Sequence, residues 1–553
     1  MILSENRRMQ RRDFLTTAGL ALAAPRNAAG QDDRAMRGGV PPPHFDPRRY
    51  GATGDGKTKD TAAIQRAVDL CTAAGGGVVY LSPGTYLSGT VILKDNVTFH
   101  LEAGATLLGS TLLADYRRQS GPPVLGDANG KHLIFAREAK NVTLSGAGRI
   151  DGQGPAFWVP SERKVPPPED GWRDVATYDW KPLDRPSPMV EFFACTNLRI
   201  EGVTLANAAG WTLRPIECDT VAISGIKIRN PIIGPNTDGI DPTCCRNVFI
   251  SDCDISTGDD CICLKSEGPY GRMGLTRNIT ITNCVLTCCC NGLKFGTATR
   301  GGFENVTFSN SVIYNDQVPL NARVISGIAI EMVDGGWVDG VVISNIRMQR
   351  VRTPIFIRLG ARREAGKLRG VMIDNVHATG AILTSSVTGI PGHDVEDVAL
   401  TNIRIETEEG GKSEWTERAI PEVEKGYPEA RMFGRLPAYG LYCRHVTGLK
   451  LDNARLVSAA PDQRPALHCE EVKSLRVERL EATAPSNAQP LMRLVNVRDA
   501  LVSGCSAPAL RGAAVEVAGA ESAGVRLVGN DFGRATKALE LKNGAAAGAV
   551  EER

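Results

Sequence analysis

A turn residue followed by a short alternating run of apolar and polar residues recurs along most of this chain. Alternation with a period of two is the pattern of a half-buried β-strand. Clear starts of this repeat lie at Asn141, Asn197, Thr220, Asn247, Asn278 and Asn305. From Asn197 to Asn305 the successive starts are 23, 27, 31 and 27 residues apart, which is typical of a solenoid whose loops vary in length.

The repeat predicts an all-β chain that forms a single-stranded right-handed parallel β-helix with an N-terminal capping helix. Gly is abundant, at 59 of 553 residues, and aromatic residues make up only 5% of the chain. Both values are expected when aliphatic side chains stack in the core and the turns need positive φ. The length alone would also allow several ordinary domains. We favour one coil over residues 46–535, with a tail over 536–553, because no Pro/Ser-rich linker divides the repeat.

One strongly helical window, residues 60–74, stands apart from the repeat. Apolar residues from Ile64 to Cys71 fall on one stripe of this window, and Asp60 is placed to cap its N-terminus. We expect this helix to cover the open end of the coil, where unpaired strand edges would invite aggregation.

Residues 1–30 have the features of an export signal rather than of the fold. Arg11 and Arg12 precede an uncharged run over 16–24, which is the pattern of a twin-arginine signal. This run is too short for a membrane span, which needs roughly twenty apolar residues. We therefore expect export by this signal, a linker over residues 31–45, and a mature protein that is soluble in the periplasm or outside the cell.

The 15 cysteines would ordinarily indicate disulfides in an exported protein. However, Cys195, Cys218, Cys253 and Cys284 recur at equivalent points of successive repeats, which predicts a ladder of small apolar side chains inside the coil. The run of three cysteines at 288–290 fits a metal site less well than it fits a buried ladder, because zinc ligands are usually spaced by two to four residues. We expect most of the cysteines to be unpaired.

Two acidic segments lie one repeat apart, Asn-Thr-Asp-Gly at 236–239 and Gly-Asp-Asp at 258–260. A strand, a turn and a strand between them would place Asp238 and the acidic pair on neighbouring rungs, about 4.8 Å apart. Crowded carboxylates raise at least one carboxyl pKa, which is what a general acid needs near neutral pH. Such clusters are typical of glycosidic bond cleavage, although Asn236 and Asp252 would also suit plain turns between strands.

Together these segments resemble the family 28 glycoside hydrolases, the polygalacturonase group, from Tyr50 to about residue 455. Further motifs of that style lie at 50–56, 148–154 and 207–211. The resemblance implies that Asp259 protonates the leaving oxygen. It also implies that Asp238 and Asp260 activate the water, with inversion at the anomeric carbon.

Two motifs depart from the pattern of that family. Asn291 stands where the family carries the His of Gly-His-Gly. Ala329 and Glu331 stand where it carries the Arg and Lys of Arg-Ile-Lys. Because Ala and Glu cannot form the charge-assisted bonds that a galacturonate carboxylate needs, we expect a neutral or deoxy sugar, such as rhamnose or galactose, at the cleaved bond.

Substrate contacts are expected from residues beside these motifs and from two long loops, 153–185 and 408–439. The candidates are Asn236, Lys265, Asn291, Lys294, Glu331 and Arg431. The two lysines would hold a sugar hydroxyl or carboxylate, or else span rungs or face solvent. Loop aromatic residues would stack on sugar rings or pack on the coil; they include Trp158, Trp172, Trp180, Tyr427 and Phe433. Walls formed by both loops would favour attack at chain ends.

The sequence therefore predicts an exported glycoside hydrolase that acts without a metal or other cofactor on a plant or algal polysaccharide or its oligosaccharides. The formal net charge of +2 argues against a nucleic-acid partner. One alternative is a polysaccharide lyase, which in this fold typically uses Ca²⁺ and a basic residue at a uronate. The other is a non-catalytic glycan-binding β-helix, whose binding would survive loss of the acids.

Overall fold

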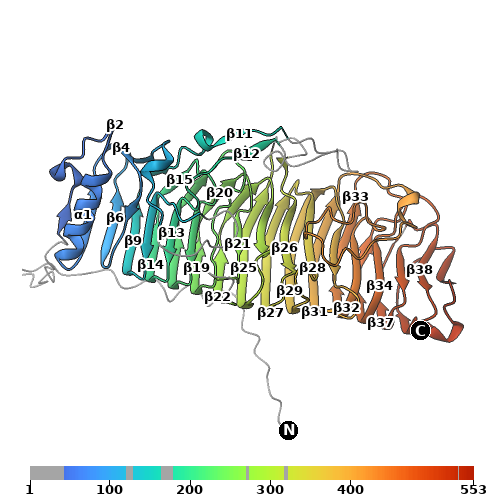
Figure 1. Cartoon of the computed structure of the whole chain (residues 1–553). Helices are drawn as coiled ribbons and strands as arrows, with labels where there is room; N and C mark the ends of the chain where they lie inside the picture. Colours follow the sequence, from blue (N-terminus) through green and yellow to red (C-terminus); the bar gives the residue numbers. More distant parts are fainter. Residues whose placement is uncertain are drawn as a thin grey trace, which may run out of the picture. The chain divides into compact units, whose positions relative to one another are not determined.

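Parallel strands from successive turns of the chain stack into a right-handed β-helix in this computed structural model (Figure 1). The structure describes residues 43–119, 129–162, 179–268, 273–316, 322–507, 509–533 and 535–552. Among the strands described, β11 (Trp158–Pro160) and β12 (Trp180–Pro182) form an antiparallel pair, and the others pair in parallel. The fold class predicted from the repeat is confirmed.

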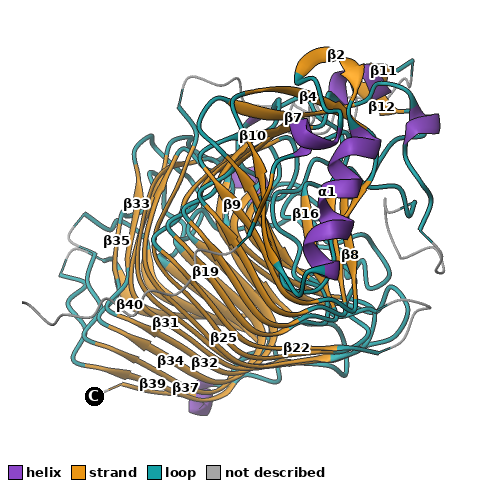
Figure 2. Ribbon diagram, turned by 90° about the vertical axis from the view of Figure 1, so that its left-hand side faces the viewer, coloured by secondary structure: helices purple, strands orange, loops and turns teal. Residues whose placement is uncertain are grey.

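Stacked rows of apolar side chains fill the interior of the coil. The longest strands pair in parallel and in register (Figure 2): β25 (Gly302–Tyr314), β27 (Trp337–Gln349), β29 (Lys367–Ala381) and β31 (Val395–Thr407). This register stacks four buried valines, Val306, Val341, Val371 and Val398. The next residue along each of two of these strands, Val342 and Met372, points outward and is exposed, as a period of two requires.

A second stack of strands is buried on both faces. Its members are β21 (Ile262–Leu264), β24 (Asn291–Phe295), β26 (Ser326–Met332) and β28 (Thr353–Leu359), and every residue in them is buried. Bridges at Ile240 continue the stack from Ile262 back to Leu213 of β16 (Leu213–Ile216). Because successive side chains point to opposite faces, the outward-facing residues of this stack are buried as well as the inward-facing ones.

Asparagines at the turns account for the repeat in the sequence. Asn141, Asn197, Asn247, Asn278 and Asn305 all have φ between 54 and 57°, a region that Asn tolerates better than most L-residues. The side-chain amide of Asn278 donates to Asn247 Oδ1 at 3.0 Å, and that of Asn305 donates to Asn278 Oδ1 at 3.2 Å. Successive rungs are therefore joined by a ladder of asparagine hydrogen bonds.

Helix α1 (Thr61–Ala73) packs on the N-terminal strands, as the sequence predicts (Figure 1). Cys71 and the rest of its apolar stripe are buried. Asp60 does not cap the helix with its side chain, contrary to the prediction. Its carboxylate instead accepts the backbone N–H groups of Thr53 at 2.8 Å and Gly54 at 3.1 Å, so it holds the turn that precedes the helix.

The coil extends further at both ends than the repeat indicates. Strand β1 (His44–Phe45), inside the expected linker, pairs with β3 (Gly77–Leu81). Strand β40 (Lys537–Lys542) pairs with β38 (Ala513–Ala518), so the segment 536–553, expected as a tail, contributes to a further rung.

Three expectations fall outside the described residues: the export signal over 1–30, most of the linker over 31–45, and Trp172 of the first long loop. Within the part of the chain that is described, no helix combines the length and the apolarity needed to cross a bilayer. The other two tryptophans of this loop, Trp158 and Trp180, are described and belong to the antiparallel pair β11–β12.

None of the fifteen cysteines, all of which lie within the described residues, forms a disulfide, but the predicted single ladder is wrong. Cys195, Cys218 and Cys245 stack on one another at the corner that precedes β14 (Thr196–Glu201) and its neighbours. Cys253 and Cys284 stack on each other at a different corner. Each rung has more than one inward-facing corner, so small buried residues at different corners give similar spacings in the sequence.

Candidate active site

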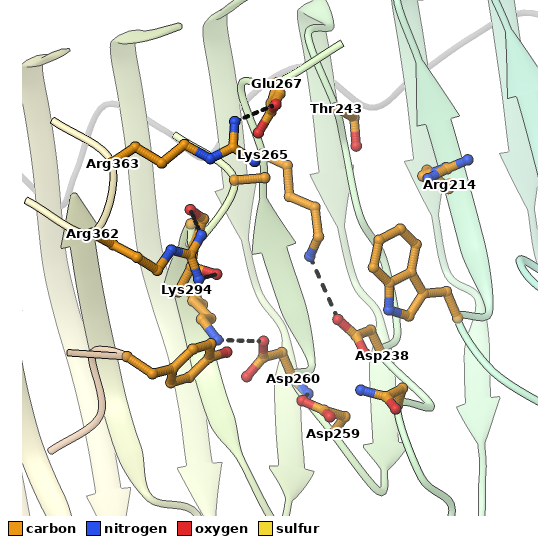
Figure 3. A pocket seen from close by; sticks show the side chains of 16 residues that line it. Arg214, Asp238, Thr243, Asp259, Asp260, Lys265, Glu267, Lys294, Arg362 and Arg363 are labelled. Carbon is orange, nitrogen blue, oxygen red and sulfur yellow. Dashed lines mark hydrogen bonds and ion pairs between the residues drawn. The ribbon is translucent and has the colours of Figure 1, made fainter. Parts of the chain in front are cut away.

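A pocket of about 290 Å³ lies on the outward face of the covered strands (Figure 3). Its walls include the three aspartates predicted as catalytic, both predicted lysines and Asn236. The other residues that line it are Trp211, Arg214, Thr243, Glu267, Gly296, Thr297, Ala298, Arg362, Arg363 and Tyr427. The strand register therefore brings together groups that are far apart in the sequence.

Neighbouring rungs place Asp238 and Asp260 side by side. Ile240 bridges Ile262 in parallel, and each aspartate precedes its isoleucine by two residues. The amide of Gly239 donates to the carbonyl oxygen of Asp260 at 2.8 Å. A Cβ atom on Gly239 would lie 2.3 Å from a backbone oxygen of the next rung, so this close approach requires glycine.

Lys265 is buried between Asp238 and Asp241. Its Nζ lies 2.9 Å from Asp241 Oδ1 and 3.5 Å from Asp238 Oδ2, and 4.8 Å from the centre of a Trp211 ring. Burial disfavours the ammonium ion, but the carboxylates beside it hold the pKa of Lys265 well above its usual range. The pKa of Asp238 is raised all the same, because of its burial and then the charges of Asp241 and Asp259.

Lys294 makes equivalent contacts on the following rung. Its Nζ lies 3.1 Å from Asp260 Oδ2, 3.5 Å from Glu331 Oε2 and 5.8 Å from the centre of the Tyr427 ring. Burial alone would raise the pKa of Asp260, but the charges of Lys294 and then Lys265 outweigh burial and lower it. Asp260 is therefore an ionised carboxylate.

Asp259 has a different environment from Asp238 and Asp260. It forms no ion pair with any described residue, and its Oδ1 accepts the backbone N–H of Asp260 at 2.8 Å. Burial, and after it the charge of Asp260, raises the pKa of Asp259 to about 7. A carboxyl group that keeps its proton close to neutral pH has the property that a general acid requires.

Asn291 contacts Asp260 and is not part of the pocket wall. Its side-chain amide donates to Asp260 Oδ1 at 2.7 Å, and its backbone N–H donates to the same oxygen at 3.1 Å. Asn236 does line the pocket. Its φ is 53°, and its Oδ1 accepts a hydrogen from Arg185 at 3.4 Å, so it is both a turn residue and part of the wall.

Two residues predicted to bind substrate are engaged elsewhere. Glu331 is buried behind Lys294 and pairs with it. Arg431 donates to both carboxylate oxygens of Glu429 at 2.8 Å. Neither residue lines the pocket. The prediction failed because the sequence alone does not show which carboxylate or ammonium group lies next to each residue.

The aromatic residues of the two long loops divide between packing and the pocket. Trp158 is buried and donates its Nε1–H to the carbonyl oxygen of Ala209 at 2.7 Å, and Phe433 is buried in a small apolar cluster. Tyr427 lines the pocket. The loop 408–439 therefore supplies a wall of the site, as predicted.

Arg362 and Arg363 line the pocket and, like Arg214, were not predicted. Arg362 Nε donates to Asp334 Oδ1 at 2.8 Å, and its Nη2 donates to the carbonyl oxygen of Thr297 at 3.1 Å. Arg363 Nη1 donates to Glu267 Oε1 at 3.1 Å. Both arginines follow the last residue of β28 and belong to no motif, so only the position of that strand shows that they reach the pocket (Figure 3).

Among the residues that the structure describes, two sets of ligand atoms, each within 4.8 Å of one another, could hold a cation: Asp238 with Asp241 and Cys263, and Asp259 with Asp260 and Cys290. An ammonium group already occupies the first set, because Lys265 Nζ lies 2.9 Å from both Asp241 Oδ1 and Cys263 Sγ. Lys294 likewise contacts Asp260. Hard divalent cations need about six oxygen ligands, so these residues fit buried lysines better than a resident metal.

The parallel β-helix and its pocket of buried carboxyl groups define a carbohydrate-cleaving enzyme of the glycoside hydrolase class. The profile described as "Glycosyl hydrolases family 28" matches residues 83–424, and the chain belongs to that family. It is 26% identical over 404 residues to a "Probable polygalacturonase" from Vitis vinifera, which covers 68% of this chain and 77% of that protein. It is 29% identical over 305 residues to an "Endo-polygalacturonase" from Pectobacterium carotovorum subsp. carotovorum, and this match covers 54% of this chain and 71% of that protein.

Solved structures of the same fold include two exopolygalacturonases. The hyperthermoactive enzyme from Thermotoga maritima has a TM-score of 0.52 at 23% identity, over 67% of this chain and 88% of that one. The family 28 enzyme from Yersinia enterocolitica has a TM-score of 0.57 at 18% identity, over 80% of this chain and 78% of that one. At these identities the likeness establishes the fold.

Proposed function

We propose that this protein hydrolyses glycosidic bonds of a pectic polysaccharide or its oligosaccharides, at a chain end and with inversion at the anomeric carbon. The observation that supports this most is the different protonation of adjacent carboxyl groups. Asp259 has a pKa of about 7, whereas Asp260 is ionised beside Lys294. Inverting hydrolysis needs one acid that holds a proton and one base that does not.

In this mechanism Asp259 donates its proton to the leaving oxygen while a water attacks the anomeric carbon from the opposite face. Asp260 accepts the proton of that water, so one proton leaves the acid and one arrives at the base. Asp238 Oδ1 is buried and has no hydrogen-bond partner among the described residues. A buried acceptor of this kind is satisfied by water, and Asp238 would orient the water that attacks.

Action at a chain end is supported by the aromatic residues of the pocket. Trp211 lies over Lys265, whereas Tyr427 lies over Lys294 and Arg362. Tyr427 belongs to the long loop 408–439, whose residues Ile420 and Phe433 pack with Phe356 of β28 beside the pocket. Aromatic faces at two places in a small pocket suit a terminal sugar better than the middle of a chain.

A neutral or deoxy sugar at the cleaved bond is supported by the pairing of the pocket's cations. Four of them are bound to carboxylates of this chain: Lys265 to Asp241, Lys294 to Asp260, Arg362 to Asp334 and Arg363 to Glu267. A substrate carboxylate would have to compete with these partners and would gain little from the bond. Rhamnose or galactose would avoid that competition.

A panel of defined glycans tests this function. The protein is incubated with polygalacturonate, rhamnogalacturonan and neutral pectic oligosaccharides, with Ca²⁺ or with a chelator, and the products are identified by mass spectrometry. We expect saturated products, released one sugar at a time, in equal amount under both conditions. Unsaturated products that require Ca²⁺ would identify a lyase. Glycan binding without products, unchanged in Asp259→Asn, would identify a binding protein.

We also propose that residues 1–30 direct export by the twin-arginine route to the periplasm or beyond. The pair Arg11 and Arg12 and the uncharged run that follows support this proposal. Replacing both arginines by lysine and fractionating the cells provides the test. The variant should stay in the cytoplasm, and a variant that is exported as well as the wild type would disprove the proposal.

A further inference from the structure

Glu331, at the last position of the family's Arg-Ile-Lys motif, pairs with Lys294 of the neighbouring strand, and both side chains are buried. Burial raises the pKa of Glu331 to about 8, although the charge of Lys294 lowers it. The register between β24 and β26 places Lys294 beside Ala329. Two residues beyond Ala329 on the same strand, Glu331 points to the same face. A Cβ atom on Gly296 would lie 2.5 Å from the backbone oxygen of Glu331, so Gly296 stands directly beside that residue. Ala329 has only a methyl group and Gly296 has no side chain, so neither stands between Lys294 and Glu331, which meet diagonally at 3.5 Å.

The contacts of Lys294 come from three elements. Asp260 precedes β21 and lies 3.1 Å from Nζ, and Glu331 on β26 lies 3.5 Å away. Tyr427 covers the ammonium group from the loop, with its ring centre at 5.8 Å. The side chains of Lys294 and Glu331 are 6% and 1% exposed. Other titratable groups that act on this pair are the thiol of Cys290 and the carboxylate of Glu429.

We propose that Lys294 and Glu331 form a positioning pair that keeps Asp260 ionised and in place as the catalytic base. This inference rests on the proposed function, in which Asp260 accepts the proton of the attacking water. A buried carboxylate without a counter-charge would take up a proton. The family carries a cation at position 329. In this chain Lys294, on the neighbouring strand β24, provides a cation beside that position, and Glu331 contacts its ammonium group.

The neighbouring rung has a similar geometry, although burial there raises the pKa of the pocket carboxylate, Asp238. Lys265 lies between the catalytic Asp238 and a second buried acid, Asp241, at 3.5 and 2.9 Å. In both cases an ammonium group bridges one carboxylate of the pocket and one carboxylate behind it. Lys294 thus acts on the reaction through its contact with the base, Asp260, and does not need to touch the sugar ring itself.

The test compares the pH profiles of kcat/KM for Lys294→Met, Lys294→Arg and the wild type on the best substrate. In Lys294→Met the acidic limb should move to higher pH by about one unit or more, because Asp260 then loses its counter-charge. The loss should appear in kcat more than in KM. Lys294→Arg keeps the charge and should restore the limb toward its wild-type position. Lys542→Met, which removes a lysine paired with Glu516 at 2.8 Å, is the matched control and should change neither limb.

An acidic limb of Lys294→Met that coincides with the wild-type limb would overturn the proposal.

Thermal unfolding as a function of pH provides a readout that needs no activity. The counter-charge stabilises the ionised form of Asp260, and that stabilisation is lost as pH falls and the group is protonated. The melting deficit of Lys294→Met should therefore shrink toward about pH 4, and a deficit independent of pH would also contradict the proposal. A wild-type protein that hydrolyses no glycan would refute the proposed function, but would leave this second test intact.

Discussion

The side-chain amide of Asn291 donates a hydrogen bond to Asp260 Oδ1 across 2.7 Å, and both residues are buried. Asn291 occupies the place of a histidine in the family pattern. An amide donates this bond at every pH, whereas an imidazole changes its charge near pH 6.5. The support that Asp260 receives from this position is therefore independent of pH.

The first prediction exchanges this amide for an acid. Asn291→Asp should lower kcat/KM at neutral pH by more than about tenfold, a loss of about 1.4 kcal/mol in transition-state stabilisation, because a second carboxylate raises the pKa of Asp260. Steady-state kinetics on the best pectic substrate measure the loss. Asn305→Asp, the same change on the exposed asparagine ladder, is the control and should keep full activity. Equal activity in the two variants would show that Asn291 does not support the base.

The second prediction concerns the acid. Asp259→Asn should lower turnover by about 10²- to 10⁴-fold, the usual contribution of general acid catalysis, because the amide is isosteric but has no acidic proton. Asp252→Asn changes an aspartate at an exposed turn, with φ of 58°, and should leave the rate unchanged. If Asp259→Asn kept more than about a tenth of the wild-type rate, the assignment of the acid would be wrong, since that is a loss of less than about 1.4 kcal/mol.

The third prediction concerns the alkaline limb of the pH profile. Burial and the charge of Asp260 raise the pKa of Asp259 to about 7, and a general acid works only while it is protonated. The rate should therefore be level between the acidic limb set by Asp260 and about pH 7, and should fall as the pH rises through that value. Measuring kcat/KM across the range tests this. A rate that stays level well above pH 8 would mean that another group protonates the leaving oxygen.

Much of the fold could be predicted because the contacts of a coil are local. Each rung touches its neighbours, and the left-handed turn of each repeat appears in the sequence as an asparagine such as Asn247 or Asn278. The last rung was missed because β40, Lys-Ala-Leu-Glu-Leu-Lys, is preceded by no such asparagine. The side-chain role of Asp60 was missed because its partners, two backbone N–H groups, depend on the path of the preceding turn.

The site could be predicted only in part, for a similar reason. The aspartates belong to motifs, and their spacing matches one rung, so the structure brings them together where the sequence places them. The pairing of Lys294 with Glu331 depends on the register of two strands and on two small neighbours, which no motif records. Arg362 reaches the pocket from a loop after β28 and gave no signal in the sequence.

The fourth prediction concerns the cysteines, none of which forms a disulfide in the described part of the chain. Titration of the denatured protein should give the same number of thiols with and without reductant. Most of the cysteines are buried, and burial raises the pKa of Cys71 to about 11, so in the folded protein they should react slowly. A deficit of several thiols in the absence of reductant would reveal disulfides.

The central claim is inverting hydrolysis with Asp259 as acid and Asp260 as base, and the most direct test is the stereochemistry of the first product. Proton NMR spectra recorded during turnover of the best pectic substrate show which anomer forms before mutarotation. We predict a saturated sugar whose anomeric configuration is opposite to that of the cleaved bond. A product that keeps the original configuration, or one that carries a new double bond, would contradict the mechanism.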